Sequence, residues 1–438
     1  MDGGLKTDIL IVGGGAAGTL AAIAAARKGQ KVLLLEARGF LGGSRTLMGV
    51  DTFNGFFSPG EQTFQLVGGI SYEVVERLAR KKAAFIRPNT FGCGPVVTYD
   101  MEQLKIVFEE MVLESGANLL YYSSVPQVDS GQDRIRSVTV CNKAGLTQVE
   151  AALVVDATGD LDVAASAGEE YELAGKDGKP VQSLTTIFYM ANVDTQKVFS
   201  MSQATLTQIM QEASESGRYK LTRIGGSIHP TPHPGFVHAN LTRIPNVDAT
   251  DPFALTAAEI EGRRQVQEYV RFLQNEIPGF ENSYLAVTAS MIGVRETRRL
   301  IGEYILTGED VSSSARFYDA VACCSAPMED HHSGKDVHWQ FLHSGDYYQI
   351  PYRSLLPRKN NNLLVAGRCL SATHEGQASA RNSAQCMAMG EAAGAAAALA
   401  FQKGVSPRQL DYQDLHPELV KQGVILEPFL VEKERMVL

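Results

Sequence analysis

Apolar positions near the start of the chain fall into two short runs on either side of a helical segment. Residues 9–12 form a continuous apolar run, which is typical of a strand buried on both faces. Three glycines follow, and residues 16–28 have the alanine-rich composition of a helix. A second apolar run covers residues 31–35. The order of strand, glycine turn, helix and strand predicts a βαβ unit built on a parallel sheet.

Similar patterns recur further along the chain. Residues 152–155 predict a buried strand that continues into the segment Ala-Thr-Gly-Asp at residues 157–160. A plain turn in which Asp160 begins the next helix is the alternative for this segment. Residues 362–368 predict another strand that ends in glycine, and residues 383–401 predict a helix dense in Ala and Gly. Small residues along that helix indicate close packing on the sheet.

The middle of the chain has a different character. It contains strand-like runs, polar loops rich in His and Pro, and an amphipathic helix pattern near residues 256–276. We therefore predict an α/β fold with a Rossmann-like domain, a parallel sheet in three layers, formed by residues 1–167 and 346–438. An α+β substrate domain is expected as an insertion over residues 168–345.

The glycines of the first turn suit nucleotide binding. Gly13 can adopt the dihedral angles of the turn, Gly15 lets the backbone approach a pyrophosphate, and Gly18 lets the helix lie close to the sheet. The N–H groups at the start of the helix would then face the phosphates. Glu36 ends the second strand, where an acidic side chain accepts hydrogen bonds from a ribose with a free 2'-hydroxyl. Close packing alone is the alternative explanation for these glycines.

Composition excludes several other classes of protein. The net charge of -9 argues against a nucleic-acid partner, because such proteins need a basic surface. The N-terminus lacks signal-peptide features, and the apolar residues 392–401 are too few to span a bilayer. The six cysteines have no metal-type or redox-type spacing. We expect a cytoplasmic protein with free thiols and no membrane partner.

Several motifs carry a resemblance to a known family. Gly42 and Gly43 follow Glu36 with the spacing of the extended FAD fingerprint found in the glutathione-reductase structural class. The stretches VVDATGD, MIGVRETRRLIGEYILTGEDV, YYQIPYRSLLP and LLVAGRCLSATHEGQASARNSAQCMAMGEAAGAAAALA add to it. Together they resemble the FAD-dependent oxidoreductase family with a fumarate-reductase-like FAD domain. The resemblance implies non-covalent FAD and redox chemistry, but it does not determine the substrate.

The resemblance and the nucleotide motifs together define an expected FAD site. Its residues follow the ends of the predicted strands or lie in the closing motif. They are Gly13, Gly15, Ala17, Gly18, Glu36, Ala37, Arg38, Gly43, Ser44, Arg45, Val125, Ala157, Thr158, Gly159, Asp160, Gly367, Arg368, Ala378 and Ser379. The helix that starts near Ser383 is expected to direct its positive end at the flavin.

Four residues are the predicted catalytic groups. His374 lies between the last strand and the closing helix, and its imidazole could act as an acid or base near the flavin. A hydrogen-bonded loop histidine is the alternative. Arg295 could bind a carboxylate or a hydroxyl-rich substrate, or could belong to a surface ladder of charges with Glu296 and Glu303. Asp330 and His332 are expected near the substrate, and because the histidines here lack closed-site spacing we predict no metal.

Three functions are compatible with these patterns. The first is an FAD-dependent oxidoreductase that transfers a hydride between the flavin and a small alcohol, amine or activated alkene. The second is a flavin monooxygenase, and the third is a flavin-binding redox sensor without turnover. The polar middle domain, rich in histidine, favours an enzyme. A small-molecule substrate and a possible homo-oligomer are the expected partners.

Overall fold

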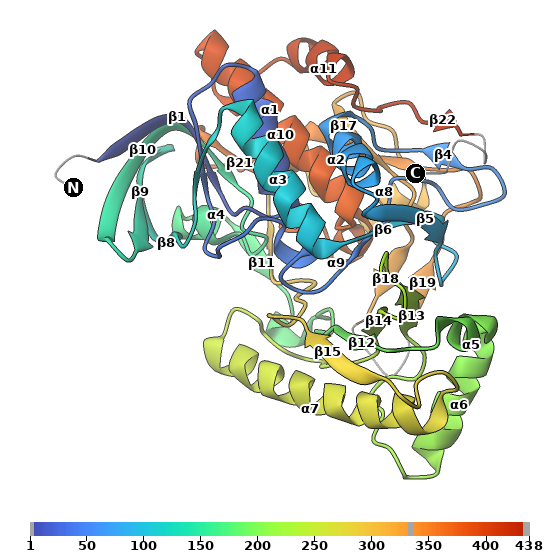
Figure 1. Ribbon diagram of the computed structural model, residues 1–438. Helices are drawn as coiled ribbons and strands as arrows, with labels where there is room; N and C mark the ends of the chain where they lie inside the picture. Colours follow the sequence, from blue (N-terminus) through green and yellow to red (C-terminus); the bar gives the residue numbers. More distant parts are fainter. Residues whose placement is uncertain (1–3, 332–336, 432–438) are drawn as a thin grey trace.

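The computed structural model describes residues 4–331 and 337–431, which form a larger domain and a smaller one (Figure 1). The larger domain is organised around a sheet with the strand order β7-β2-β1-β10-β9-β8, in which β21 also pairs with β10. Strands β7, β2, β1, β10 and β21 are parallel to one another, and β8 and β9 are antiparallel. Their bounds are β1 Leu5–Val12, β2 Val32–Leu35, β7 Asn118–Leu120, β8 Ser124–Gly131, β9 Arg134–Asn142, β10 Gly145–Asp156 and β21 Leu363–Val365.

The register of the parallel strands brings their carboxyl ends to one edge of the sheet. Val12 at the end of β1 is opposite Leu35 of β2 and Asp156 of β10, and Asp156 is opposite Val365 of β21. The segments that follow these four strands therefore meet at a single edge. Ligands of open α/β sheets bind at such an edge.

Helices cover one face of this sheet, and they pack unusually closely. Helix α1 (Ala16–Arg27) crosses α10 (Ser383–Lys403), with α2 (Gly69–Arg80) and α3 (Met101–Ser115) beside them. A side chain at Gly390 or Gly394 of α10 would collide with the backbone carbonyls of Ala17 or Ala21 in α1. The glycines of α10 are therefore a packing requirement, but they allow the close approach of α1, whereas the sequence predicts close packing on the sheet.

The smaller domain has its own antiparallel sheet and core. The sheet has the order β13-β14-β12-β15, and its strands are β12 Phe188–Ala191, β13 Ser227–Pro230, β14 Val237–Asn240 and β15 Tyr284–Thr288. Helix α7 (Pro252–Glu276) buries Val266, Tyr269 and Phe272 in a core shared with this sheet. Helices α5 (Thr195–Ser200) and α6 (Gln203–Glu215) complete the domain (Figure 1).

The remaining elements are short, and most of them pack on the larger domain. Strand β17 (Ala320–Cys324) pairs with β20 (Tyr348–Pro351) in the core of the larger domain, so the chain returns to that core before residue 345. The other strands are β3 Thr52–Phe53, β4 Phe64–Gln65, β5 Ala84–Pro88, β6 Pro95–Tyr99, β11 Tyr171–Leu173, β16 Arg298–Leu300, β18 Met328–Asp330, β19 His338–Gln340 and β22 Phe429–Leu430. The other helices are α4 Asp162–Ser166, α8 Gly308–Ser312, α9 His374–Ala380 and α11 Tyr412–Lys421, with short 3-10 turns at Gly43–Arg45, Lys176–Gly178, Tyr352–Leu355 and Pro407–Gln409.

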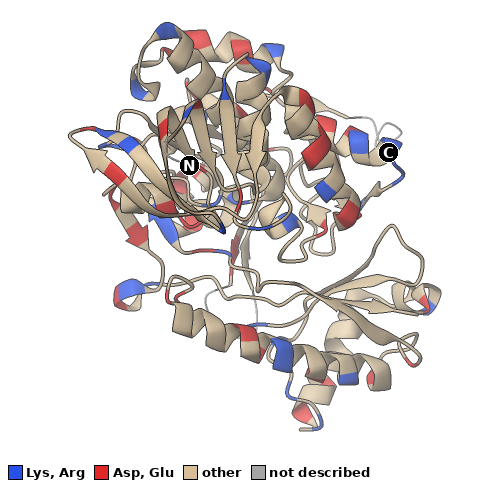
Figure 2. Cartoon of the chain, turned by 60° about the vertical axis from the view of Figure 1, so that its left-hand side comes forward, with Lys and Arg blue, Asp and Glu red and all other residues tan. Residues whose placement is uncertain are grey.

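The predicted fold class is confirmed. The α/β domain has a mixed sheet whose central strands are parallel, and the inserted part contains antiparallel sheets. Charges of both signs are mixed over the two domains (Figure 2), for example in the ion pairs along α7 between Glu259 and Arg263 and between Glu268 and Arg271. Within the described residues, no helix combines the length and apolar character needed to cross a membrane.

Candidate functional site

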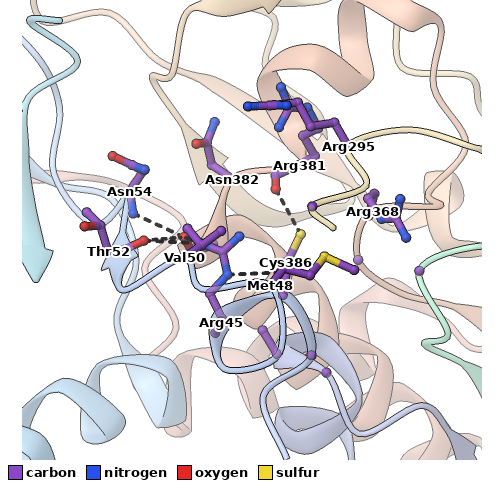
Figure 3. Close-up of a pocket in the computed structure, with 18 of the residues that line it drawn as sticks. Arg45, Met48, Val50, Thr52, Asn54, Arg295, Arg368, Arg381, Asn382 and Cys386 are labelled. Carbon is purple, nitrogen blue, oxygen red and sulfur yellow. Dashed lines mark hydrogen bonds between the residues drawn. The ribbon is translucent and has the colours of Figure 1, made fainter. Parts of the chain in front are cut away.

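A cavity of about 500 Å3 lies where the two domains meet. Its walls come from the segments after β1, β2, β10 and β21, from the N-terminus of α10, and from the sheet of the smaller domain. Figure 3 shows part of this wall, with Arg295, Arg368 and Arg381 near Asn382, and Arg45 nearby. The carboxyl edge of the parallel sheet is therefore the floor of a cavity that both domains close.

The glycine turn after β1 has the geometry that the sequence predicts. Gly13 has a φ of +98°, and a Cβ atom there would lie 2.6 Å from the carbonyl oxygen of Ala157. Helix α1 starts at Ala16 without a side-chain cap and without an acidic residue in its first turn. Gly15 and Ala17 line the cavity, so the positive end of this helix faces it.

Glu36, the acidic residue after β2, is hydrogen-bonded to the glycine turn. The Glu36 carboxylate accepts hydrogen bonds of 2.8 Å from the backbone N–H groups of Gly14 and Arg38. Burial raises the pKa of Glu36, and these two hydrogen bonds oppose that rise. The double glycine serves a close approach, because a Cβ atom on Gly43 would lie 3.0 Å from the Cα atom of Gly15. Both glycine motifs thus enclose one end of the cavity.

The segment after β10 joins the segment after β21 by an ion pair. The Asp160 carboxylate lies 2.7 Å from Nη2 of Arg368, while Nη1 of Arg368 is buried without a hydrogen-bond partner. Helix α4 begins after Leu161, so Asp160 is not its N-cap. The Asp156 carboxylate binds the N–H groups of Thr158 and Ala164, and burial raises its pKa to about 6. The buried carboxylate therefore holds the shape of this turn.

Helix α10 begins at Ser383, as the sequence predicts, and its N-terminus faces the cavity. Asn382 provides no side-chain cap, and Oγ of Ser383 accepts a hydrogen bond of 2.6 Å from Arg45. The start of α10 therefore presents positive potential to the cavity.

Most of the predicted FAD residues line this cavity, and four do not. Gly18 lies against the backbone of Gly13, in the packing role predicted for it. Val125 in β8 packs against the core beneath the sheet. Ala378 and Ser379 are buried in α9, where the Ser379 hydroxyl donates a hydrogen bond to the carbonyl of Ala326. These last two therefore support the wall instead of forming it.

Arg295 and Arg381 lie close to each other and form a cationic part of the cavity wall (Figure 3). Burial and the neighbouring charge of Arg381 lower the pKa of Arg295 to about 9. Nε and Nη2 of Arg381 are buried without hydrogen-bond partners, and Nη2 lies 3.8 Å from the Glu329 carboxylate. Arg295 is thus a half-buried residue of the cavity wall and not part of a surface ladder of charges.

His374 does not occupy the position expected of it. It begins α9, is 6% exposed and is absent from the cavity wall. Its Nδ1 lies 2.9 Å from the Glu296 carboxylate and its Nε2 lies 3.2 Å from the Asp330 carboxylate. Burial would lower the pKa of His374, but the hydrogen bonds to Asp330 and Glu296 prevail and raise the pKa to about 9. His374 is therefore a cation held in an ion pair, and the geometry does not place it as an acid or base for a substrate.

Asp330 and His332 are the two other residues predicted near the substrate, and Asp330 is also absent from the described cavity wall. Asp330 is engaged by His374, and the adjacent Glu329 lines the cavity in its place. Glu329 lies 2.7 Å from Nε2 of His331. Although burial alone would raise it, the pKa of Glu329 is lowered by the surrounding His331, Arg381 and Arg295. His332 lies outside the described residues.

The cavity wall also contains a group of three side chains that the sequence analysis did not identify. They are Asp51, His229 and His238. His229 and His238 are opposite each other in the register of β13 and β14, and their rings stack with centroids 4.0 Å apart. Nε2 of His229 lies 2.9 Å from the Asp51 carboxylate. Burial lowers the pKa of both imidazoles, that of His238 to about 3, so both are neutral. A hairpin pattern around the turn at residues 231–235 was the only signal that could have paired them.

These features define a two-domain enzyme that binds a dinucleotide at the edge of a parallel sheet. The chain belongs to the FAD dependent oxidoreductase family, whose profile matches residues 8–419. The protein is therefore a flavoprotein oxidoreductase, and FAD is its cofactor. The uncapped start of α1 and the unpaired Nη1 of Arg368 fit the pyrophosphate of FAD, and Glu36 fits its ribose. Bound there, FAD supplies hydride-transfer chemistry.

Solved structures with the same fold are distant in sequence. A geranylgeranyl bacteriochlorophyll reductase-like protein from Thermoplasma acidophilum is 15% identical, with 96% of this chain and 85% of that chain covered and a TM-score of 0.51. The p-nitrophenol 4-monooxygenase PnpA from Pseudomonas putida DLL-E4 is 11% identical, with 96% and 89% covered and a TM-score of 0.51. At these identities the similarity shows the fold alone. No curated protein sequence matches this chain significantly.

Proposed function

We propose that this enzyme transfers a hydride between FAD and a small organic anion, namely an alcohol, amine or activated alkene that carries a carboxylate. The observation that supports this proposal is the shared cavity. One space is lined both by the nucleotide motifs and by Arg295, Arg381 and the polar groups of the smaller domain. A substrate in the second part would be adjacent to a cofactor in the first.

The paired guanidinium groups support an anionic substrate. The two half-buried guanidinium groups repel each other, and the nearby Glu329 carboxylate is already hydrogen-bonded to His331. Nε and Nη2 of Arg381 have no hydrogen-bond partner. A buried donor without a partner costs about 1–3 kcal/mol, so a ligand that accepts these hydrogen bonds would be favoured. A carboxylate matches the fork of a guanidinium in both charge and shape.

The chain's own residues would then have separate tasks. Arg295 and Arg381 would bind the carboxylate and orient the substrate. Arg295 is itself held in place, because Nη1 donates hydrogen bonds to the carbonyl of Ser183 and to Oγ1 of Thr185. The N-terminus of α10 would favour a negative charge on the cofactor. The walls from both domains would exclude water from the reacting atoms.

The proposal also retains the finer expectations from the sequence. The spacing of Glu36, Gly42 and Gly43 supports a dinucleotide fold of the glutathione-reductase class and non-covalent FAD. We retain a cytoplasmic location and a possible homo-oligomer as expectations, and the net charge of -9 supports the expectation of no nucleic-acid partner. Acid precipitation of the purified protein tests the attachment, because non-covalent FAD would remain in the supernatant.

Anaerobic titration tests the main proposal. The purified yellow protein would be mixed with matched pairs of compounds, such as hydroxy acids and their amides, while flavin absorbance is followed. We expect carboxylates to reduce the flavin and their neutral analogues to do so much more weakly. Reduced enzyme mixed with oxygen would distinguish a monooxygenase, which would form a transient oxygenated flavin. A flavin that no compound in the panel reduces would favour the redox-sensor alternative.

Variants connect that titration to the cavity. Arg295→Gln and Arg381→Gln should weaken binding of the carboxylate by roughly 10- to 100-fold, the scale of a charge-assisted hydrogen bond, with FAD retained. Arg263→Gln is the matched control, because Arg263 is an exposed arginine on α7. Unchanged carboxylate affinity in both cavity variants would contradict the anionic substrate.

A further inference from the structure

Three potential metal ligands converge in the wall of the cavity. They are Asp51, which precedes β3 in the larger domain, and His229 and His238 from adjacent strands of the smaller domain. Within the described residues this is the one group of three His, Cys, Asp or Glu side chains with donor atoms all within 4.8 Å of one another. It is distinct from the histidines near residue 331, where the sequence raised and rejected a metal.

These side chains are deeply buried, yet much of their hydrogen-bonding capacity is unused. Asp51 is 1%, His229 is 5% and His238 is 3% exposed. Oδ2 of Asp51 and Nδ1 of His229 are buried without a hydrogen-bond partner in the described structure, and the His238 ring has a backbone contact with Gly49 but no hydrogen bond of good geometry. Nε2 of His238 lies 3.8 Å from Oδ1 of Asp51, which is too far for a hydrogen bond. Buried polar atoms without partners are rare, and an ion bound among these side chains would supply the missing partners.

We propose that Asp51, His229 and His238 bind a divalent transition-metal ion, of the class of Fe2+ or Zn2+, on the substrate side of the cavity. Two imidazoles and one carboxylate are the ligands used by non-haem iron sites and by catalytic zinc sites. The two rings are now stacked at an interplanar angle of 20°, so metal–ligand distances of about 2.0–2.2 Å require the imidazoles to turn until their lone pairs converge. This proposal replaces the expectation of no metal that the sequence alone supports.

The surroundings of the group fit this role. The cross-strand pairing holds the two imidazoles side by side, and Oγ1 of Thr52 lies 3.3 Å from Nε2 of His229 and 3.2 Å from Oδ1 of Asp51. Such outer contacts orient metal ligands. The guanidinium of Arg87 is the nearest opposing charge, but it donates its hydrogen bonds to Thr98, Pro88 and Thr52 and none to Asp51.

The position of the group gives the ion a function. All three ligands line the cavity, so their ion would keep open coordination positions facing a substrate. A hydroxyl or carbonyl oxygen of the substrate would bind there while Arg295 and Arg381 hold its carboxylate. Metal binding itself does not depend on the proposed hydride transfer, whereas this use of the ion rests on it.

Metal content measured on the FAD-loaded protein tests the site without any substrate. The protein would be treated with a chelator, incubated with Zn2+ or, anaerobically, with Fe2+, and freed of unbound metal by gel filtration. Elemental analysis and flavin absorbance would then give the metal and FAD content per chain. We expect about one ion per chain, and less than about one tenth of an ion would overturn the proposal.

Single variants assign the ion to these ligands. Asp51→Asn, His229→Asn and His238→Asn should each weaken metal affinity at least about 10- to 100-fold. His233→Asn should not, because His233 lies in the connection between the same two strands, is exposed and hydrogen-bonds to Asp100. Asp51→Glu keeps a carboxylate and should restore binding if Asp51→Asn loses it. Equal binding by wild type and the three ligand variants would overturn the site, even if flavin reduction by carboxylates proceeds as proposed.

Discussion

Two histidine sites in this protein have opposite environments. His374, at the start of α9, is bonded to the carboxylates of Glu296 and Asp330 and is absent from the cavity wall. His229 and His238, in the sheet of the smaller domain, line the cavity and retain ring nitrogens without partners. The pKa is raised to about 9 in His374 and lowered to about 3 in His238.

This difference shows what makes a buried histidine available for chemistry. A histidine between two carboxylates is a fixed cation whose hydrogen bonds are already used, so its role is to hold elements together. Here it connects α9 with Glu296, which also forms a buried ion pair with Arg299. A neutral imidazole with a free lone pair facing a cavity can bind a metal.

Substituting the histidines of the two sites should give the largest contrast, which we expect in the rate of flavin reduction. His229→Asn and His238→Asn should slow substrate-driven flavin reduction by about 100- to 10,000-fold, because they remove a group that binds the reacting part of the substrate, directly or through an ion. His374→Asn should change that rate by less than about tenfold. Stopped-flow absorbance of the flavin measures both. The reverse order of effects would restore His374 as the acid or base.

Stability should show the opposite pattern. Glu296→Gln removes the carboxylate that His374 and Arg299 share, and it should lower the free energy of unfolding by about 3–5 kcal/mol, the cost of breaking a buried ion pair. Glu150→Gln, in an exposed pair with Lys6, should change it by less than about 1 kcal/mol. Urea unfolding followed by circular dichroism measures both values. Equal effects would mean that the buried network contributes little to folding.

The pH dependence of stability isolates His374 itself. Its folded pKa of about 9 lies above the value of 6.5 for a free histidine. Its stabilising contribution is therefore complete below pH 6.5 and is lost as the pH rises through 9, by up to about 3 kcal/mol. Urea unfolding at intervals across that range should show the decline. In His374→Asn the decline should be smaller by the same amount, and identical slopes would contradict the raised pKa.

A smaller effect is expected at the end of the cavity that neither histidine site touches. Glu36→Ala removes the carboxylate expected to bind the ribose and should weaken FAD affinity by about 1–3 kcal/mol. His374→Asn and His229→Asn should leave FAD affinity nearly unchanged. Flavin fluorescence during titration of the apoprotein with FAD measures these affinities. Normal FAD affinity in Glu36→Ala would remove Glu36 from the ribose role.

Much of the nucleotide end of the cavity could be predicted because its signals are local. Gly13, Gly15 and Glu36 belong to one strand-turn-helix-strand segment, in which spacing along the chain implies spacing in the fold. The expectation for His374 rests on adjacency to the last strand, which says where a backbone lies but not where its side chain points. Its partner Glu296 is 78 positions away, so the ion pair that occupies the imidazole has no local signal.

The sequence by itself determined the fold class, the glycine turns and the acidic residue after β2, since periodicity and backbone sterics act over a few residues. Only the tertiary structure decided which polar groups share the substrate side of the cavity. Asp51 and His229 are 178 positions apart, and Arg295 meets Arg381 through the return of the chain from the smaller domain. Such groups meet because separate hydrophobic cores bring their elements together, and no short pattern encodes that meeting.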